Sequence, residues 1–249
     1  MTLLAFRDVS KRFPDGARWT VVLDRVSFEI DIGETVGILA SKGAGKTTLL
    51  RVVAGLETPD AGEVCWKDQD LAEMSTSERA RILRTGGIAM ARGAWRALDS
   101  ASVIEYVENS LYSEKLTMSE AEIRARQALE DAEAGGLRDQ SIGQLGLTER
   151  VRVELAHALA RQPRLLLMDE PAVFPSAEEA RKFYALLHAL RDRFGFALLI
   201  ASQEVMALRG LRRILNLSNG RLYSTDSRRG VIHLADRRVA GEGGGASAS

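Results

Sequence analysis

The sequence predicts an α/β fold in which a mostly parallel sheet, flanked by helices, carries an antiparallel β subdomain and an all-helical subdomain. Residues 35–40, 164–170 and 196–202 are nearly continuous apolar runs, which are typical of parallel strands covered on both faces. Residues 3–13 and 22–31 alternate apolar and polar side chains, as half-buried strands do. These patterns favour an antiparallel sheet at the start of the chain beside a parallel core.

The helical subdomain is predicted from the region between residues 100 and 140, where the strand pattern disappears. The stretch "MSEAEIRARQALEDAEAG" has a small apolar face before Gly135 and Gly136, made up of Ala121, Ala125, Ala128, Leu129 and Ala132. We expect one domain over residues 1–235, with its helical subdomain at about residues 92–158. The Gly/Ser/Ala-rich residues 236–249 have little to bury and are expected to form a disordered tail.

Composition excludes several classes of protein. Because 34 basic residues balance 34 acidic ones, nucleic acid is not an expected partner. The single cysteine, Cys65, excludes an internal disulfide framework and every multi-cysteine metal site. The first thirty residues have no secretory core, and no apolar run approaches the roughly 18 to 20 residues that cross a bilayer. The expected compartment is the cytosol.

The stretch "VGILASKGAGKTTLLRVVAG" predicts a phosphate-binding P-loop, because a glycine-rich loop follows an apolar strand and precedes a helical run. Backbone N–H groups of such a loop bind phosphates, Lys46 reaches the β and γ oxygens, and the Thr47 hydroxyl meets Mg²⁺. Ala40 replaces the first glycine of the pattern, which matters only if the backbone there needs a positive φ. The expected contacts of ATP are Ser41, Lys42, Gly43, Ala44, Gly45, Lys46, Thr47 and Thr48. The alternative is a Gly/Lys turn in an unrelated α/β protein.

"RLLLMDEP" predicts the carboxylates that a P-loop NTPase core needs from a neighbouring strand. Asp169 at the strand end can hold Mg²⁺ together with Thr47, and Glu170 is the catalytic candidate that orients or polarises the attacking water. Alone, an apolar run ending in Asp-Glu is more often a strand boundary with solvated carboxylates. Its position about 120 residues after the P-loop makes the functional interpretation the stronger one.

The order of these motifs resembles the ATP-binding subunits of ABC transporters over nearly the full chain. "VRVELAHALARQPRLLLMDEP" is similar to the family's signature helix, and "FALLIASQE" to its final switch strand. The resemblance implies that Phe13 stacks on adenine, although a core phenylalanine is the alternative. It also implies two partners, an integral membrane permease and a second ABC ATP-binding subunit in a homodimer or heterodimer. A groove near residues 92–102 would receive a permease helix and place the chain on the inner face of the cell membrane.

The signature positions depart from this family. Its L-S-G-G-Q motif, which clamps the γ-phosphate bound to the other subunit, falls on Leu145, Gly146, Leu147, Thr148 and Glu149. Since a backbone approaches a ligand closely only where no Cβ intervenes, Leu147 is expected to obstruct the clamp. Glu149 would add repulsion if its carboxylate faced a phosphate.

At three other positions this chain also lacks the residue that the family carries. The switch histidine falls on Gln203, which can contact the nucleotide by hydrogen bonding but carries no charge. The glutamine that links Mg²⁺ to the permease is expected in "GGIAMARGAW", where Ala91 or Arg92 stands instead. The loop after Glu170 reads "AVFPSAEE" and has no aspartate in register.

The leading interpretation is therefore a degenerate ABC ATP-binding subunit that binds Mg-ATP and acts by nucleotide-dependent dimerisation, with at most slow ATP hydrolysis. The alternative is a fully active transport ATPase homodimer with an unusual signature, since Lys46, Thr47, Asp169 and Glu170 are all retained. A regulator that uses the ATP fold as a brace under a membrane protein is close to the first interpretation. A nucleic-acid-repair or translation ATPase is not favoured, because the second domain or coiled-coil insert usual in those proteins is missing.

Overall fold

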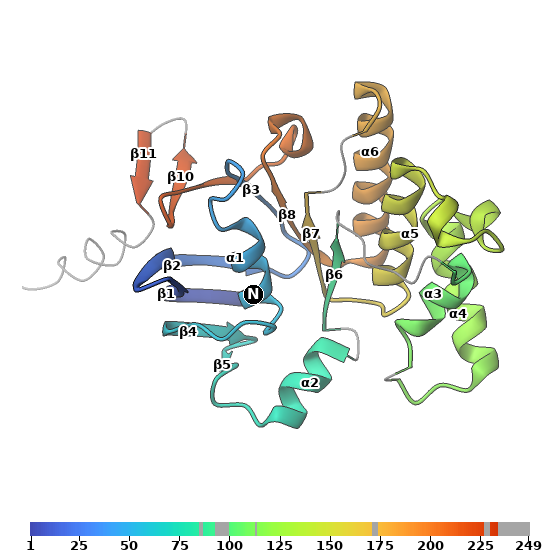
Figure 1. Ribbon diagram of the computed structural model, residues 1–249, viewed down its shortest axis with the longest axis horizontal. Helices are drawn as coiled ribbons and strands as arrows, with labels where there is room; N and C mark the ends of the chain where they lie inside the picture. The colour runs from blue at the N-terminus through green and yellow to red at the C-terminus, as the bar shows by residue number, and fades with distance from the viewer. Residues whose placement is uncertain (85–86, 93–99, 113, 171–173, 227–229, 234–249) are drawn as a thin grey trace, which may run out of the picture.

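The structure is a computed structural model that describes residues 1–84, 87–92, 100–112, 114–170, 174–226 and 230–233. Its strands form two sheets, one of four strands in the order β2-β1-β4-β5 and one of seven in the order β11-β10-β9-β3-β8-β7-β6. In Figure 1 the small sheet lies at one side of the molecule and helices α3, α4 and α5 lie at the other, with strands β3, β8, β7 and β6 of the large sheet between them.

The small sheet is antiparallel, as the alternating pattern predicted. Its strands are β1 (Thr2–Asp15), β2 (Arg18–Asp31), β4 (Ala61–Trp66) and β5 (Gln69–Asp70). Inward-facing side chains of these strands pack closely, with 4.8 Å between the ring centroids of Phe6 and Phe28. This packing fixes β2 against the rest of the core, which matters for the site because β2 also contacts the glycine-rich loop.

The large sheet has a parallel core of β9 (Ile214–Ser218), β3 (Thr35–Leu39), β8 (Ala197–Ser202), β7 (Leu165–Asp169) and β6 (Ile88–Arg92). Antiparallel strands β10 (Arg221–Asp226) and β11 (Gly230–His233) extend one edge. Leu165 and Leu167 of β7 face one hydrophobic core, whereas Leu166 and Met168 face the other. Burial on both faces explains the continuous apolar runs and confirms the predicted mixed α/β fold class.

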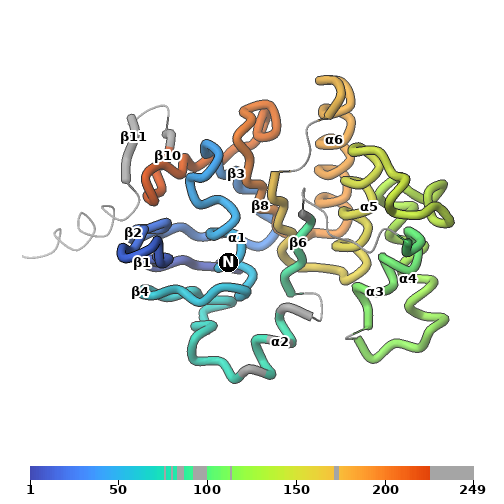
Figure 2. Tube along the Cα trace, in the orientation of Figure 1, coloured from blue at the N-terminus to red at the C-terminus, as the bar shows by residue number. Residues whose placement is uncertain are grey.

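The described part of the chain has six α-helices around the sheets: α1 (Lys46–Val53), α2 (Thr76–Arg84), α3 (Val103–Asn109), α4 (Met118–Asp131), α5 (Leu147–Leu159) and α6 (Ala177–Phe194). Short 3-10 turns are η1 (Gly135–Leu137), η2 (Ile142–Gln144) and η3 (Val205–Leu208). The tube in Figure 2 shows α3, α4 and α5 grouped together, away from β1, β2 and β4. Among the described residues, no helix combines the length and the apolar character that a bilayer crossing needs.

Helix α4 begins where its sequence indicates but ends earlier than expected. Thr117 and Glu120 form a capping box at its start, with Glu120 N–H donating to Thr117 Oγ1 over 3.3 Å. Its buried side chains include three members of the expected apolar face. The helix ends at Asp131, because Glu133 adopts a left-handed φ of 52° before Gly135 is reached. The predicted tail at residues 236–249 lies outside the described residues.

Candidate nucleotide-binding site

The glycine-rich loop connects the end of β3 to the first residue of α1. Gly45 is the N-cap of α1, with φ at 101° and no side-chain cap, so the first N–H groups of the helix are available to a ligand. A Cβ on Gly45 would lie 2.9 Å from Val22 Cγ1 and 3.0 Å from Val22 O, so glycine is required for two separate reasons. Ala40 is not among the residues with positive φ, and its departure from the P-loop pattern therefore causes no backbone strain.

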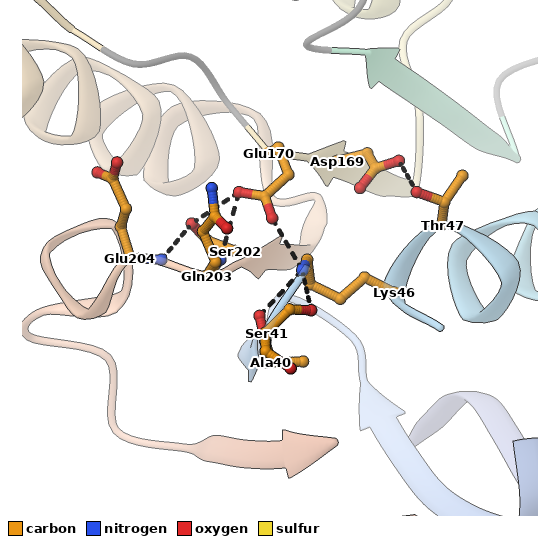
Figure 3. A network of polar contacts seen from close by, with 9 residues as sticks. All are labelled: Ala40, Ser41, Lys46, Thr47, Asp169, Glu170, Ser202, Gln203 and Glu204. Carbon is orange, nitrogen blue, oxygen red and sulfur yellow. Dashed lines mark hydrogen bonds and ion pairs between the residues drawn. The ribbon is translucent and has the colours of Figure 1, made fainter. Parts of the chain in front are cut away.

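Lys46 lies at the centre of the site and is almost completely buried. Its ammonium donates to the carbonyl oxygens of Ala40 and Ser41, each at 2.9 Å. It also forms an ion pair with Glu170, with 2.9 Å between Nζ and Oε1. Figure 3 shows these three contacts converging on the ammonium nitrogen. Since an ammonium has three N–H donors, every donor of Lys46 has a protein partner in this state.

Thr47 and Asp169 bring two oxygen donors together from α1 and β7. The Thr47 hydroxyl donates to Asp169 Oδ2 over 2.8 Å, as Figure 3 shows. Hydroxyl and carboxylate oxygens are hard ligands that suit Mg²⁺, so the donor set fits that ion. The residues that the structure describes contain no group of three or more His, Cys, Asp or Glu side chains that could hold a metal. Mg²⁺ at this place would therefore need further oxygens from phosphate and water.

Glu170 connects the P-loop lysine to the end of β8. Its Oε2 accepts hydrogen bonds from Ser202 Oγ at 3.3 Å and from the Gln203 backbone N–H at 3.2 Å. Its own N–H donates to Ala201 O, which holds the chain where it leaves β7. Glu170 has a positive φ of 46°, a strained backbone for a non-glycine residue, and such strain is often concentrated at functional sites.

Phe13, the candidate for adenine stacking, lies on the β1–β2 hairpin near the P-loop. It pairs in register with Thr20, two residues from Val22, which packs against Gly45. Its ring is half-buried, and Lys11 Nζ lies 5.2 Å from the ring centroid. The hairpin thus brings Phe13 to the part of the molecule where the glycine-rich loop lies.

The five residues at the signature positions lie at the start of α5, where Leu145 precedes the helix, Gly146 is its N-cap and the other three form its first turn. Leu147 is 65% exposed, whereas Leu145 is buried. Thr148 Oγ1 donates to Glu179 Oε2 over 3.2 Å, which ties this turn to the start of α6. The Glu149 carboxylate accepts the Gly146 N–H at 2.8 Å and thus caps its own helix. The feature that extends outward from this turn is the Leu147 side chain.

Some of the other residues predicted from the sequence lie within the described residues, and others lie outside them. Ser41 and Lys42 are exposed on the glycine-rich loop. Ala91 is buried in β6, and the backbone of Arg92 pairs in register with Asp169. Most of the expected permease groove, residues 93–99, and the start of the loop after Glu170, residues 171–173, lie outside the described residues.

Three further residues predicted from the sequence belong to the site, and one residue of the site was not predicted. Gly43 has a φ of 81°, and Ala44 of the loop and Thr48 of α1 are half-buried. Sequence reasoning missed Ser202, which is buried and hydrogen-bonded to Glu170. A serine at the end of an apolar strand has no distinguishing signal, although its position directly before Gln203 places it next to an expected site residue.

Taken together, the fold and this loop define a P-loop nucleotide-binding protein. The family model described as "ABC transporter" matches residues 23–173. The chain belongs to the ABC transporter family, and it is an ATP-binding subunit of that family.

Individual relatives cover most of the chain. It is 30% identical over 227 residues to the lipoprotein-releasing system ATP-binding protein LolD of Shewanella denitrificans. This match covers 91% of this chain and 97% of the relative. The solved dimeric cassette MJ0796, in a post-hydrolysis state bound to ADP and Pi, matches with a TM-score of 0.79 at 25% identity. The match covers 87% of this chain and 95% of the MJ0796 chain. CbiO1 of Clostridium perfringens, part of the ABC transporter complex cbiONQ, shares the fold with a TM-score of 0.77 at 22% identity, covering 96% of this chain and 91% of its own.

Proposed function

We propose that this subunit binds Mg-ATP through its own P-loop and drives or regulates a membrane permease by nucleotide-dependent dimerisation, with weak or no ATP hydrolysis. One contrast supports the proposal most directly. On the P-loop side, Lys46 and Glu170 are in contact and Thr47 and Asp169 are hydrogen-bonded. On the signature side, the exposed Leu147 stands where the family has a glycine that approaches the γ-phosphate.

In this proposal Mg²⁺ is held by Thr47 and Asp169, with ATP phosphates and water as its other ligands. The bound ion would neutralise negative charge on the phosphates. Phe13 would stack on the adenine, and Lys46 would exchange a protein acceptor for a phosphate oxygen. Gln203 offers an amide where the family has an imidazole, so it can hydrogen-bond to a phosphate without adding charge.

The expected partners are a second ABC ATP-binding subunit and an integral membrane permease. The dimeric state of the MJ0796 relative supports the first, and the lipoprotein-releasing system named for the LolD relative supports the second. Through the permease the subunit would lie on the inner face of the cell membrane. In a mixed dimer this P-loop would face the partner's signature but lack a switch histidine, while the partner's P-loop would face Leu147. Both composite sites would then hydrolyse ATP poorly.

Nucleotide-dependent association gives the first test. Light scattering after size exclusion should show the subunit, with its co-purified partner subunit or alone, associating in Mg-ATP and dissociating in Mg-ADP. Lys46→Ala should abolish the difference between the two nucleotides, and Lys182→Ala, an exposed lysine on α6, should preserve it. A mass that is independent of nucleotide in every combination would contradict dimerisation as the mode of action.

A fully active transport ATPase is the alternative, favoured by one observation. Glu170 directly follows Asp169 and contacts Lys46, which is where a residue that polarises water must be. The two functions differ in turnover and in its dependence on Glu170.

A further inference from the structure

A polar groove lies at the edge of the large sheet opposite the P-loop. Strand β3 runs from Thr35 to Leu39 and continues into the glycine-rich loop, whereas the groove opens at the Thr35 end. Its volume is about 680 Å³. Its walls are the turn before β3, the last turns of α6 and residues 210–213 before β9. It is therefore separate from the nucleotide site.

Three arginines line this groove, and two of them are held in place by the protein. Arg191 donates from Nη1 to Thr35 Oγ1 over 2.8 Å and from Nε to Asp192 Oδ1 over 3.0 Å. Arg213 Nη1 donates to Glu34 Oε1 over 2.9 Å. Arg191 donates from all three of its nitrogens, because its Nη2 also bonds to Asp192 Oδ1, whereas Arg213 donates from Nη1, and these bonds fix both orientations. Because a guanidinium has five N–H donors, each retains further donor capacity.

Arg212 is the third arginine and has no such attachment. It is exposed and, within the described part of the chain, forms neither an ion pair nor a side-chain hydrogen bond. The two carboxylates of the groove, Glu34 and Asp192, are already paired with Arg213 and Arg191. The groove therefore has three guanidinium groups and only two acids, with the unmatched charge on Arg212.

Two further groups bear on the charge of the groove. His188 also lines it, and its pKa is lowered first by burial and then by the neighbouring Arg191, with Asp192 acting in the opposite direction. The C-terminal end of α6 contributes a partial negative charge, which Arg191 in its last turn offsets. An anion in the groove would consequently be attracted by the arginine side chains and not by a helix end.

The groove wall formed by residues 210–213 packs closely against β3. A Cβ on Gly37 of β3 would lie 3.0 Å from Leu208 Cδ2 and 3.0 Å from Leu211 Cδ1, so residues 208–211 pack directly on the strand. The Gly37 N–H donates to Arg213 O over 3.0 Å. A groove with a wall held in this way is formed before a ligand arrives, as is usual for small-molecule sites.

We propose that this groove binds a small ligand that carries two or more phosphate or carboxylate groups. Arg212 and Arg213 contact the anionic groups, and Arg191 provides the positive surroundings. Planar guanidinium groups match both oxyanions with paired hydrogen bonds, and two anionic groups use both chain-adjacent arginines at once. The site does not depend on the function proposed for the P-loop.

Calorimetric titration of the full chain with inorganic pyrophosphate, and separately with citrate, tests the proposal. Arg212→Gln should weaken binding about tenfold, the loss expected for one charge-assisted contact. Arg209→Gln is the matched control, because Arg209 is an exposed arginine of the same segment that does not line the groove. Lys46→Ala separates this site from the P-loop and should leave the groove's share of the binding intact.

The outcomes are distinct. Pyrophosphate binding that survives Lys46→Ala and weakens in Arg212→Gln supports a phosphate ligand, and the same pattern with citrate supports a carboxylate ligand. Binding that disappears in Lys46→Ala and is unchanged in Arg212→Gln belongs to the P-loop and overturns the proposal. Equal weakening by Arg209→Gln and Arg212→Gln would indicate diffuse surface charge and also overturn it, as would the absence of binding by both probes.

Discussion

Lys46 and Glu170 form an ion pair across the candidate site, with 2.9 Å between Nζ and Oε1. The other two donors of the lysine are directed to the carbonyl oxygens of Ala40 and Ser41. An arriving phosphate must therefore replace at least one of these acceptors. Because phosphate and the Glu170 carboxylate compete for the same cation, binding of the nucleotide and release of Glu170 are coupled.

Lys46→Ala should weaken Mg-ATP binding by more than tenfold, which corresponds to about 1.4 kcal/mol. The wild-type chain should bind in the micromolar-to-millimolar range. Calorimetry on both proteins measures the difference, and Lys182→Ala controls for the loss of one positive charge elsewhere. A wild-type chain that does not bind ATP would contradict the assignment of the loop.

Glu170→Gln should tighten ATP binding by severalfold, roughly 1 kcal/mol. The substitution removes the carboxylate that competes with phosphate for Lys46 and also removes a negative charge beside the nucleotide. Calorimetric titration of both proteins with Mg-ATP gives the comparison. Weaker binding in the variant would show that Glu170 supports the bound state instead of competing with it.

Gly45→Ala should destabilise the fold by about 1 to 3 kcal/mol and impair nucleotide binding, because alanine would be strained at a φ of 101° and would collide with Val22. Gly43→Ala is the matched control: its φ is 81°, but a Cβ there would have no heavy atom within 4 Å. Chemical denaturation of the two variants separates strain from collision. Equal losses would show that the contact with Val22 is unimportant.

Restoring the family's signature should raise the hydrolysis rate if missing contacts limit it. The variant combines Gly146→Ser, Leu147→Gly, Thr148→Gly, Glu149→Gln and Gln203→His. Thr148→Gly also breaks the hydrogen bond to Glu179, so a thermal unfolding curve must show that the variant is folded. Gln203→His alone serves as the partial variant. A folded five-site variant with an unchanged rate would show that the signature is not the limiting feature.

The strands of the core could be predicted because burial on both faces leaves a strong apolar signal, as in "RLLLMDE" and "FALLIAS". Strands β6 and β9 were not predicted. Two of the three side chains known to be buried in β6 are the small Ala89 and Ala91, beside Ile88, and Asn216 interrupts the apolar residues of β9. Their place in the sheet comes from pairing with β7 and β3, which is not encoded in a local pattern.

The P-loop was predictable because its glycines, lysine and threonine are close in sequence. The contacts between separate segments were not. Glu170 was expected to act on water. No sequence pattern indicated that its carboxylate would contact Lys46, which lies 124 residues earlier in the chain. Nor did the sequence analysis anticipate that the Glu149 carboxylate would accept the Gly146 N–H at the start of its own helix.

The most direct test of the central claim is the steady-state ATPase rate of the chain together with its membrane partner, with and without Glu170→Gln. Weak hydrolysis implies a wild-type turnover well below the typical enzyme median of about 10 s⁻¹. It also implies only a slight further loss in the variant, because a carboxylate cannot help a water that the signature and switch residues fail to position. A wild-type rate at the level of ordinary transporters that is abolished by Glu170→Gln would contradict this account and identify the subunit as an active transport ATPase with an unusual signature.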